Sequence, residues 1–334
     1  MSKRIAINGF GRIGRLAFRN LLNNENLEVV AINDLTDPNI LAHLLKYDSA
    51  QGAFDGTVEV NEKGFLIKGK QINVSSIRNP EELPWKDLGV DIVLECTGIF
   101  RTNEAASKHI TAGAQKVIIS APAKGDDVQT IVLGINDDTL DLSNNVFSNA
   151  SCTTNCFSPV AKIVDDNWGI VTGSMTTIHS YTSDQRIQDA PHADLRRARA
   201  AAENIIPTST GAAVATSKVV PSVDGKISAI AFRVPVVTGS IVEFNCLVEK
   251  ETTVEAVNKV FKNKAEGPLK NILQYQTDPI VSSDIIGNPH SSIFDSLMTS
   301  VNGNMIKVVS WYDNEAGYSA RIADLTGIIA SKLA

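Results

Sequence analysis

The feature that most constrains the fold is a glycine-rich hexapeptide near the N-terminus, Gly9-Phe10-Gly11-Arg12-Ile13-Gly14. It follows a predicted strand at 4–8 and opens a predicted helix at 15–22, whose apolar residues recur at helical spacing. In this context the first glycine permits a tight turn, the second lets the backbone approach a pyrophosphate, and the third allows close helix–strand packing. The helix N-terminus adds amide donors and the positive end of a dipole. The motif therefore predicts a dinucleotide-binding βαβ unit.

Asp34 carries information about the cofactor, because it closes the next predicted strand about 20 residues after the glycine turn. A carboxylate there accepts hydrogen bonds from ribose hydroxyls and repels a 2′-phosphate, so it favours NAD over NADP. A plain βα turn followed by a capping aspartate remains an alternative, although both context and spacing favour the cofactor. Two small-residue turns are predicted at the same sheet edge, where ligand contact and helix capping stay nearly equal alternatives: Thr97-Gly98 and Ser120-Ala121.

Composition bounds the class of protein. With 334 residues the chain is about twice a typical domain, so two domains are expected. Its 43% hydrophobic and 20% charged content excludes disorder. The net charge of −6 gives no general reason to expect nucleic acid or an anionic membrane as partner. No signal segment or long apolar run is evident, so we expect a cytoplasmic protein without a dedicated nucleic-acid site.

The two halves of the chain differ in pattern, which predicts an α/β domain followed by an α+β domain. Residues 1–150 alternate short apolar strands with helices, as in a Rossmann-type, doubly wound parallel sheet. The later strands are longer and have few intervening helices, which indicates a mainly antiparallel sheet with helices on one face. The first half has predicted strands at 28–33, 91–96, 116–120, 131–134 and 146–149, with a hairpin region at 56–74. The second half has strands at 173–182, 227–235, 240–250 and 305–312, and helices at 153–168, 211–220, 253–264 and 316–333.

Cys152 is the candidate nucleophile, because it opens a predicted helix within Ser151-Cys152-Thr153-Thr154-Asn155-Cys156. A cysteine at a helix N-terminus is expected to have a lowered pKa and hence more thiolate. A metal site is not expected, since no second ligand pair with suitable spacing follows. Four cysteines are too few for a disulfide scaffold, so free thiols are expected. The remaining three are interpreted as buried small hydrophobic residues: Cys96, Cys156 and Cys246.

The partner of Cys152 must be a base, and the chain has only five histidines. His179 ends a predicted strand in the same half as Cys152, at the mouth of a long polar segment, 181–206. A Cys–His pair would hold the thiolate and shuttle protons. Position alone barely favours His179 over the others. His43 and His109 fall in predicted helices of the first half, and His192 and His290 in loops.

Three segments together carry a family resemblance: 7–15 (Ile-Asn-Gly-Phe-Gly-Arg-Ile-Gly-Arg), 150–156 (Ala-Ser-Cys-Thr-Thr-Asn-Cys) and 311–315 (Trp-Tyr-Asp-Asn-Glu). The sequence resembles phosphorylating glyceraldehyde-3-phosphate dehydrogenases over essentially its whole length. The resemblance implies a glycolytic homotetramer that oxidises glyceraldehyde 3-phosphate with NAD and captures the product with inorganic phosphate. It also implies that the last helix returns to the first domain, giving domains of 1–150 plus 316–334 and of 151–315.

The resemblance assigns roles by matching position. Cys152 resembles the catalytic thiolate and His179 its base. The segment 181–206 is implied to border the cofactor of a neighbouring subunit. The implied NAD contacts are Arg12, Ile13, Asp34, Arg78, Ser120 and Asn314, with Asn314 holding the nicotinamide amide. The glycine motif adds Gly9, Gly11 and Gly14 as cofactor-binding residues, and the strand-end turn adds Thr97. The implied sites for substrate phosphate and inorganic phosphate comprise Ser151, Thr153, Thr182, Arg197, Thr210, Gly211 and Arg233.

Two departures from the family pattern are present. Ala316 stands where the family commonly has Trp, so looser packing beside the nicotinamide is expected. After Arg233-Val234-Pro235 the family often reads T-x-x-V-S-x-x-D, and the corresponding places here hold Val236, Gly239, Ser240 and Glu243.

Three other functions share part of this sequence pattern. One is a sister dehydrogenase that oxidises erythrose 4-phosphate without phosphate; Arg197 and Thr210-Gly211 favour the phosphate-using enzyme. Another is an aldehyde dehydrogenase such as aspartate-semialdehyde dehydrogenase, against which Asp34 argues because those enzymes typically use NADP. The third is a non-catalytic NAD-binding protein acting on RNA or at the cell surface, against which an intact Cys152 and His179 argue.

Overall fold

The computed structural model describes residues 2–333 and divides into two compact units. The first contains the chain up to Ile131, then Asp138–Ala150, and the residues from Ser319 onward. The second contains Val132–Asp137 and Ser151–Tyr318. Two details differ from the division expected from the sequence. Residues 132–137 cluster with the second unit, and so does the first turn of the last helix, through Tyr318.

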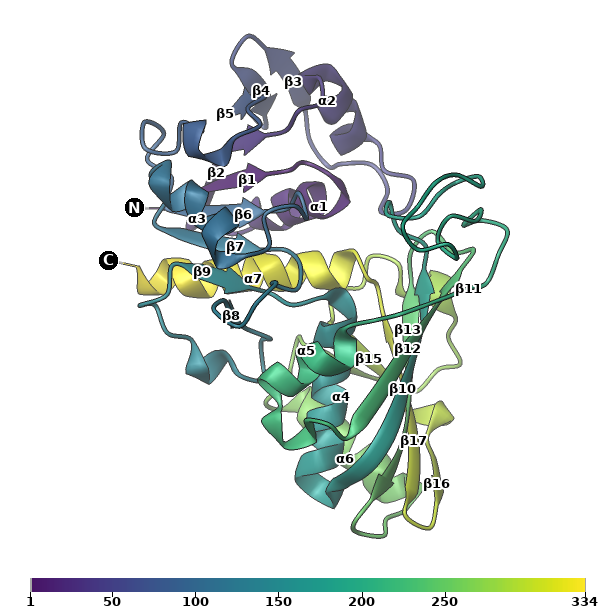
Figure 1. The fold of residues 1–334 in the computed structure, drawn as a ribbon. Coiled ribbons are helices and arrows are strands. Elements are labelled where there is room, and N and C mark those ends of the chain that lie inside the picture. The colour runs from purple at the N-terminus through teal and green to yellow at the C-terminus, as the bar shows by residue number, and fades with distance from the viewer. Residues whose placement is uncertain (1, 334) are drawn as a thin grey trace. The chain divides into compact units, whose positions relative to one another are not determined.

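The sheet of the first unit has nine strands among the described residues, in the order β3-β4-β5-β2-β1-β6-β7-β9-β8 (Figure 1). Neighbouring strands pair in parallel from β5 through β2, β1, β6, β7 and β9 to β8. The strands β3, β4 and β5 form the antiparallel hairpins expected at 56–74. The strands are β1 (Lys3–Asn8), β2 (Leu27–Asn33), β3 (Val58–Asn61), β4 (Gly64–Ile67), β5 (Lys70–Ser75), β6 (Ile92–Glu95), β7 (Lys116–Ile119), β8 (Gln129–Thr130) and β9 (Val146–Ser148). The helices are α1 (Arg12–Leu21), α2 (Pro38–Lys46), α3 (Asn103–Thr111) and most of α7 (Ala316–Lys332).

The central strands of this sheet are continuous apolar runs because both faces are covered. β6 and β7 are buried along their whole length, as parallel strands between helices generally are. One side of the core gathers around Trp85, which is fully buried, together with Val93, Val117 and Ile119. This packing presents the carboxyl ends of β1, β2 and β6 at one edge of the sheet, where ligands bind in such folds.

The predicted strand at 131–134 is wrong, because the strand lies at Gln129–Thr130, residues 131–132 are irregular and residues 133–135 form a turn. Two side chains accept hydrogen bonds from backbone N–H groups that a strand would pair with its neighbour. Asn136 Oδ1 accepts a hydrogen bond from Val132 N at 2.8 Å, and Asp137 Oδ1 accepts one from Gly134 N at 2.6 Å. Asn and Asp side chains compete with sheet pairing in this way, which an apolar run alone does not reveal.

The second unit holds a sheet in the order β11-β12-β10-β13-β17-β15-β14, with β16 paired to β17 (Figure 1). Pairing is mainly antiparallel as expected, but β10–β12 and β14–β15 are parallel. Helices α4, α5 and α6 contact these strands. The elements are α4 (Cys152–Trp168), β10 (Ile170–Ser180), β11 (Ile206–Thr208), α5 (Ala212–Val219), β12 (Ile227–Val234), β13 (Ser240–Val248), α6 (Val254–Glu266), β14 (Leu273–Gln276), β15 (Ser292–Asp295), β16 (Ser300–Asn302) and β17 (Met305–Tyr312).

The short strands β11, β14, β15 and β16 were not predicted from the sequence. In the part of the chain that the structure describes, no helix is long and apolar enough to cross a membrane.

Candidate active site

Cys152 is the first residue of α4, at the end of the helix where backbone N–H groups are unpaired. Ser151 caps the helix, and its Oγ accepts a hydrogen bond from Thr154 N at 3.0 Å. The preceding backbone is extended at Ser151, so the thiol is held at the point where the chain turns into the helix. The sequence prediction of a helix beginning at this motif is thus correct to within one residue.

His179 lies beside Cys152, with Nε2 at 3.4 Å from the sulfur. The parallel pairing of β10 with β12 places Arg233 directly opposite His179. Nδ1 of His179 lies 2.7 Å from the carbonyl oxygen of Ser180 and 2.6 Å from NH1 of Arg233. When Nδ1 carries the proton it donates to Ser180 O, and Nε2 then faces the sulfur as a proton acceptor. The geometry brings together the two residues that the sequence singled out for catalysis.

Burial dominates the ionisation of this pair. Burial, with a further contribution from the positive charge on Arg233, lowers the pKa of His179 to about 3, so the imidazole is neutral near pH 7. Burial also raises the pKa of the Cys152 thiol, and Arg233 and hydrogen bonds from Thr153 offset only part of that rise. The expectation of a lowered pKa at Cys152 is therefore wrong, because the loss of thiolate hydration outweighs the helix N-terminus. The thiol needs a neighbouring base, and neutral His179 is placed to serve.

Tyr312 supports both groups and was not singled out by the sequence analysis, although it lies within the quoted 311–315 segment. Its hydroxyl contacts the hydroxyls of Thr153 and Thr177, both at 2.9 Å. Its ring lies edge-on to His179 at a centroid distance of 5.8 Å. Tyr312 is 1% exposed, so it fixes the imidazole and the first turn of α4 from the interior.

Burial also keeps the other three cysteines protonated near pH 7. Burial raises the pKa of Cys96, Cys156 and Cys246 to about 12 in each case. All four cysteines of the described chain are free thiols. Residues 2–333 contain no cluster of three His, Cys, Asp or Glu side chains that could hold a metal ion.

Arg233 and Arg197 are the cations near His179. Arg233 is largely buried, and its Nε has no hydrogen-bond partner among the described residues. Arg197 is engaged more fully, since it pairs with Asp184 and donates from Nε to Thr208 Oγ1 at 2.9 Å. The positive charges of both arginines lower the pKa of His179, and the charge of Arg233 also acts to lower the pKa of Cys152.

The remaining hydroxyls of the expected phosphate sites are placed at helix starts or on the polar segment. Thr210 Oγ1 accepts a hydrogen bond from Ala212 N at 3.2 Å, and Gly211 is the N-cap of α5. Thr182 N donates to Gln185 Oε1 at 3.4 Å. Ser151 and Thr153 flank the sulfur-bearing residue, although Thr153 also bonds Tyr312.

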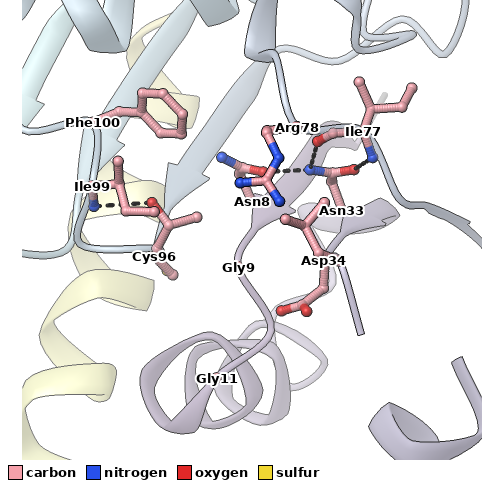
Figure 2. Close-up of a pocket in the computed structure, with 12 residues that line it drawn as sticks. Asn8, Gly9, Gly11, Asn33, Asp34, Ile77, Arg78, Cys96, Ile99 and Phe100 are labelled. Atoms are coloured by element: carbon pink, nitrogen blue, oxygen red, sulfur yellow. Dashed lines mark hydrogen bonds between the residues drawn. The ribbon is translucent and has the colours of Figure 1, made fainter. Parts of the chain in front are cut away.

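In the first unit, a cleft of about 400 Å³ lies at the carboxyl edge of the sheet (Figure 2). Gly9, Gly11, Asp34, Arg78 and Thr97 are among the residues that line it. Others are Asn8, Asn33, Leu35, Ile77, Cys96, Ile99 and Phe100.

The glycine turn fits a dinucleotide for physical reasons. Gly9 has a φ of +91°, and a Cβ there would lie 2.7 Å from Thr97 N. A Cβ on Gly14 would lie 2.2 Å from the carbonyl oxygen of Gly9, so helix and strand could not pack as they do. Gly11 has only open space around it, which leaves its backbone free to approach a ligand. Asp34 stands beside this turn and accepts a hydrogen bond from Phe10 N at 2.7 Å.

Two family models cover most of the chain. The NAD-binding domain of glyceraldehyde 3-phosphate dehydrogenase matches residues 3–103, and its C-terminal domain matches residues 151–314. The chain is 57% identical to the glyceraldehyde-3-phosphate dehydrogenase of Geobacillus stearothermophilus and 56% identical to that of Priestia megaterium, each over 99% of both chains. It is 55% identical to glyceraldehyde-3-phosphate dehydrogenase 1 of Bacillus subtilis, again over 99% of both. The chain belongs to the glyceraldehyde-3-phosphate dehydrogenase family.

Membership in the glyceraldehyde-3-phosphate dehydrogenase family confirms the fold class, the enzyme class and NAD as the cofactor. The cleft around the glycine turn supplies residues that fit this cofactor. Some of the residues assigned to the cofactor already have partners within the protein. Arg12 pairs with the buried Asp48 at 2.5 Å, and Ser120 is hydrogen-bonded to the Cys96 thiol. Ile13 lies in the first turn of α1.

A buried polar network beneath the glyceraldehyde-3-phosphate dehydrogenase cofactor cleft was missed by the sequence analysis. Glu95 accepts hydrogen bonds from Thr97 N at 2.8 Å and Asn8 Nδ2 at 2.6 Å, and pairs with His109 Nε2 at 3.0 Å. Trp85 Nε1 donates to His109 Nδ1 at 3.0 Å, which requires the His109 proton to sit on Nε2. A glutamate ending an otherwise apolar strand was the available signal.

Proposed function

We propose that this chain oxidises glyceraldehyde 3-phosphate with NAD and inorganic phosphate, giving 1,3-bisphosphoglycerate and NADH. The observation that carries the proposal is the 3.4 Å contact between Cys152 Sγ and His179 Nε2 at the start of α4, with Arg233 alongside. This pairing supplies a nucleophile, a neutral base and a cation for an anionic substrate. The family's full-length relatives carry the name of this activity.

The first stage is attack by Cys152 on the aldehyde carbon. A sulfur–carbon bond forms, and the thiol proton passes through His179 Nε2 to the carbonyl oxygen, leaving a thiohemiacetal. His179 then takes the hydroxyl proton as the hydride departs, and the product is a thioester on Cys152. NAD, when bound, supplies the acceptor for that hydride. Proton transfer by a positioned histidine typically contributes about 10²–10⁴-fold to such a step.

The second stage releases the product and restores the thiol. A phosphate oxygen attacks the thioester carbon, the carbon–sulfur bond breaks, and the sulfur regains a proton from His179. The phosphate loses its own proton to solvent, so the cycle yields one acyl phosphate and one free proton. The proposed phosphate-binding residues are Ser151, Thr153, Thr182, Arg197, Thr210, Gly211 and Arg233. An arginine fork suits these oxygens because it can bind two of them at once.

Phosphate binding near Arg233 and Arg197 also bears on the base. The charge of these arginines helps to lower the pKa of His179. A bound dianion offsets that charge, so the pKa of His179 rises toward the range in which it accepts a proton readily. Substrate binding and base strength are therefore coupled through Arg233.

For the cofactor, we propose that Gly9, Gly11, Arg12, Ile13 and Gly14 bind the pyrophosphate and that Asp34 binds the adenosine ribose. Arg78, Thr97 and Ser120 border the adenosine, and Asn314 binds the nicotinamide carboxamide. The left-handed Gly9, the open space at Gly11 and the position of Asp34 support this assignment.

We further propose a cytoplasmic homotetramer in which residues 181–206 border a neighbouring subunit. The support is that this segment exposes large apolar side chains, with Ile187 86% and Leu195 82% exposed. Burying such side chains in an interface is favourable. Sedimentation velocity tests the proposal, and a monomer at micromolar concentration would contradict it.

The activity is tested by following NADH absorbance with glyceraldehyde 3-phosphate, with and without phosphate. Erythrose 4-phosphate and NADP serve as comparison substrates. We expect turnover that requires phosphate and prefers glyceraldehyde 3-phosphate and NAD. Phosphate-independent turnover that prefers erythrose 4-phosphate would contradict the proposal.

A further inference from the structure

The Asn314 side chain is held by an unusual convergence of donors on one atom. Its Oδ1 accepts hydrogen bonds from Ser180 Oγ at 2.8 Å, Ser240 Oγ at 3.0 Å and Gly239 N at 3.1 Å. Asn314 is 6% exposed, and Ser180 and Ser240 are essentially buried. Among the described residues no group accepts a hydrogen bond from Asn314 Nδ2. One end of this amide is saturated, and the other is free.

The chemistry of these donors fixes which end is which. A backbone N–H can only donate, so the amide atom facing Gly239 N must be oxygen. Ser240 Oγ accepts from Ser180 N at 3.1 Å, which leaves its own hydrogen to point at Asn314. The nearby Thr238 hydroxyl donates to Asp313 Oδ1 at 2.8 Å and has a longer contact of 3.4 Å with Asn314 Oδ1. Turning the amide over would set its NH₂ group against Gly239 N–H.

We propose that Ser180 and Ser240 are positioning residues that lock the Asn314 amide with its NH₂ group outward, so that the chain binds the nicotinamide carboxamide through its carbonyl oxygen. This inference rests on the proposed role of Asn314 at the cofactor. An unlocked asparagine could bind either end of a carboxamide, since each amide carries both a donor and an acceptor. The locked amide offers only donors, and so it selects one rotamer of the carboxamide.

Ser180 contacts both the Asn314 amide and the catalytic base His179. Its hydroxyl orients Asn314, while its carbonyl oxygen lies 2.7 Å from His179 Nδ1 and accepts from Arg233 NH1 at 3.0 Å. Its backbone N–H reaches Ser240. Ser180→Ala removes the hydroxyl alone and leaves both backbone contacts. The effect on the orientation of Asn314 can therefore be measured apart from any effect on His179.

The test measures binding by calorimetry and needs no turnover. The probes are NAD, its 3-acetylpyridine analogue, which keeps the carbonyl oxygen but replaces NH₂ with methyl, and ADP-ribose, which lacks the nicotinamide. The proteins are the wild type, Ser180→Ala, Ser240→Ala and the double variant. Ser158→Ala is the matched control, because it removes a fully buried hydroxyl of the same unit that contacts Thr216 Oγ1 at 3.3 Å.

In the double variant we expect the affinity for NAD to fall by about three- to tenfold, as for the loss of ordinary hydrogen bonds. The acetylpyridine analogue should lose at least as much, because a turned amide can still accept from the NH₂ of NAD but offers nothing to a methyl ketone. ADP-ribose binding should not change in any variant, and Ser158→Ala should match the wild type. If the double variant fails to fold, the single variants decide, with a smaller loss each.

Two results would overturn the inference. One is NAD affinity in the serine variants equal to that of the wild type. The other is an equal loss for ADP-ribose, which would mean that the hydroxyls only support the fold. Failure of the proposed function would look different, because it would show as a wild-type chain that binds NAD but forms no NADH from glyceraldehyde 3-phosphate.

Discussion

Single residues define the chemistry, and His179 is the one whose role follows most directly from its surroundings. It is neutral near pH 7, faces the sulfur through Nε2, and is braced by Ser180 O and the Tyr312 ring. Neutral imidazole next to a thiol whose pKa is raised is the arrangement needed to remove a proton as the sulfur–carbon bond forms.

Replacing the base should slow chemistry without preventing cofactor binding. We expect His179→Asn to lower kcat by about 10²–10⁴-fold, the range for a positioned acid–base group. Steady-state NADH formation measures the loss, and calorimetric NAD affinity within about twofold of the wild type serves as the control. A variant with near wild-type kcat would refute the assignment of His179 as the base.

Asp34 governs cofactor choice at the same scale. We expect Asp34→Ala to weaken NAD binding and to reduce the difference in kcat/KM between NAD and NADP, because the carboxylate that repels a 2′-phosphate is gone. The binding free energy of NAD should become less favourable by about 1–2 kcal/mol, since Asp34 also accepts a hydrogen bond from Phe10 N in the glycine turn. An unchanged NAD-to-NADP preference would argue against contact with the ribose.

The sequence predicts the roles of reactive residues that occur only a few times in the chain, but not the roles of common side chains that support them. Cys152 and His179 stood out because the chain has four cysteines and five histidines. The roles of Ser180 and Ser240 did not, because serine hydroxyls are common, and that of Tyr312 did not, because an aromatic residue in a strand ordinarily only packs. Their roles arise only when β10, β13 and β17 come together. The ionisation of Cys152 was also misjudged, since burial cannot be weighed from a motif.

At the scale of elements, the turn between β1 and α1 depends on glycines for two different reasons. Gly14 has no room for a Cβ, whereas Gly11 has open space and an ordinary φ of −72°. Substituting alanine at the two positions therefore separates packing from ligand approach.

Gly14→Ala should lower the free energy of unfolding by about 1–3 kcal/mol, because its methyl would meet the backbone oxygen of Gly9. Gly11→Ala should change that free energy by less than about 0.5 kcal/mol and yet weaken NAD, since its methyl occupies the approach to the turn. Urea unfolding and calorimetry give the two quantities. Equal effects of both substitutions on stability would contradict the assignment.

Element types were predictable and their partners were not. The long helices α4, α6 and α7 and the strands β10, β12, β13 and β17 begin and end within a few residues of the predictions. The parallel pairing of β10 with β12, which puts Arg233 opposite His179, has no local signal. Strand order depends on contacts distant in sequence, and the short edge strands depend on them most.

At the scale of the whole molecule, a neutral buried histidine makes stability depend on pH. In the folded chain the pKa of His179 is about 3, whereas an unfolded histidine titrates near 6.5. Below the unfolded value the unfolded chain binds a proton that the folded chain does not, so the free energy of unfolding falls as pH falls from about 6.5 to about 3.

His179→Asn should remove this contribution. We expect the loss of stability between pH 7 and pH 4.5 to be smaller in the variant by about 2–3 kcal/mol. The comparison uses urea unfolding of the transition that includes the second unit, because the two units need not unfold together. Parallel pH profiles for the two proteins would contradict a strongly lowered pKa at His179.

The central claim is that oxidation proceeds through a thioester on Cys152 that phosphate resolves. Its most direct test is a rapid-mixing measurement of NADH with glyceraldehyde 3-phosphate and NAD in phosphate-free buffer. We predict a burst of about one NADH per active chain, followed by slow turnover that accelerates when phosphate is added, and no burst in Cys152→Ser. Rapid steady turnover without phosphate, or a burst that survives in Cys152→Ser, would contradict the claim.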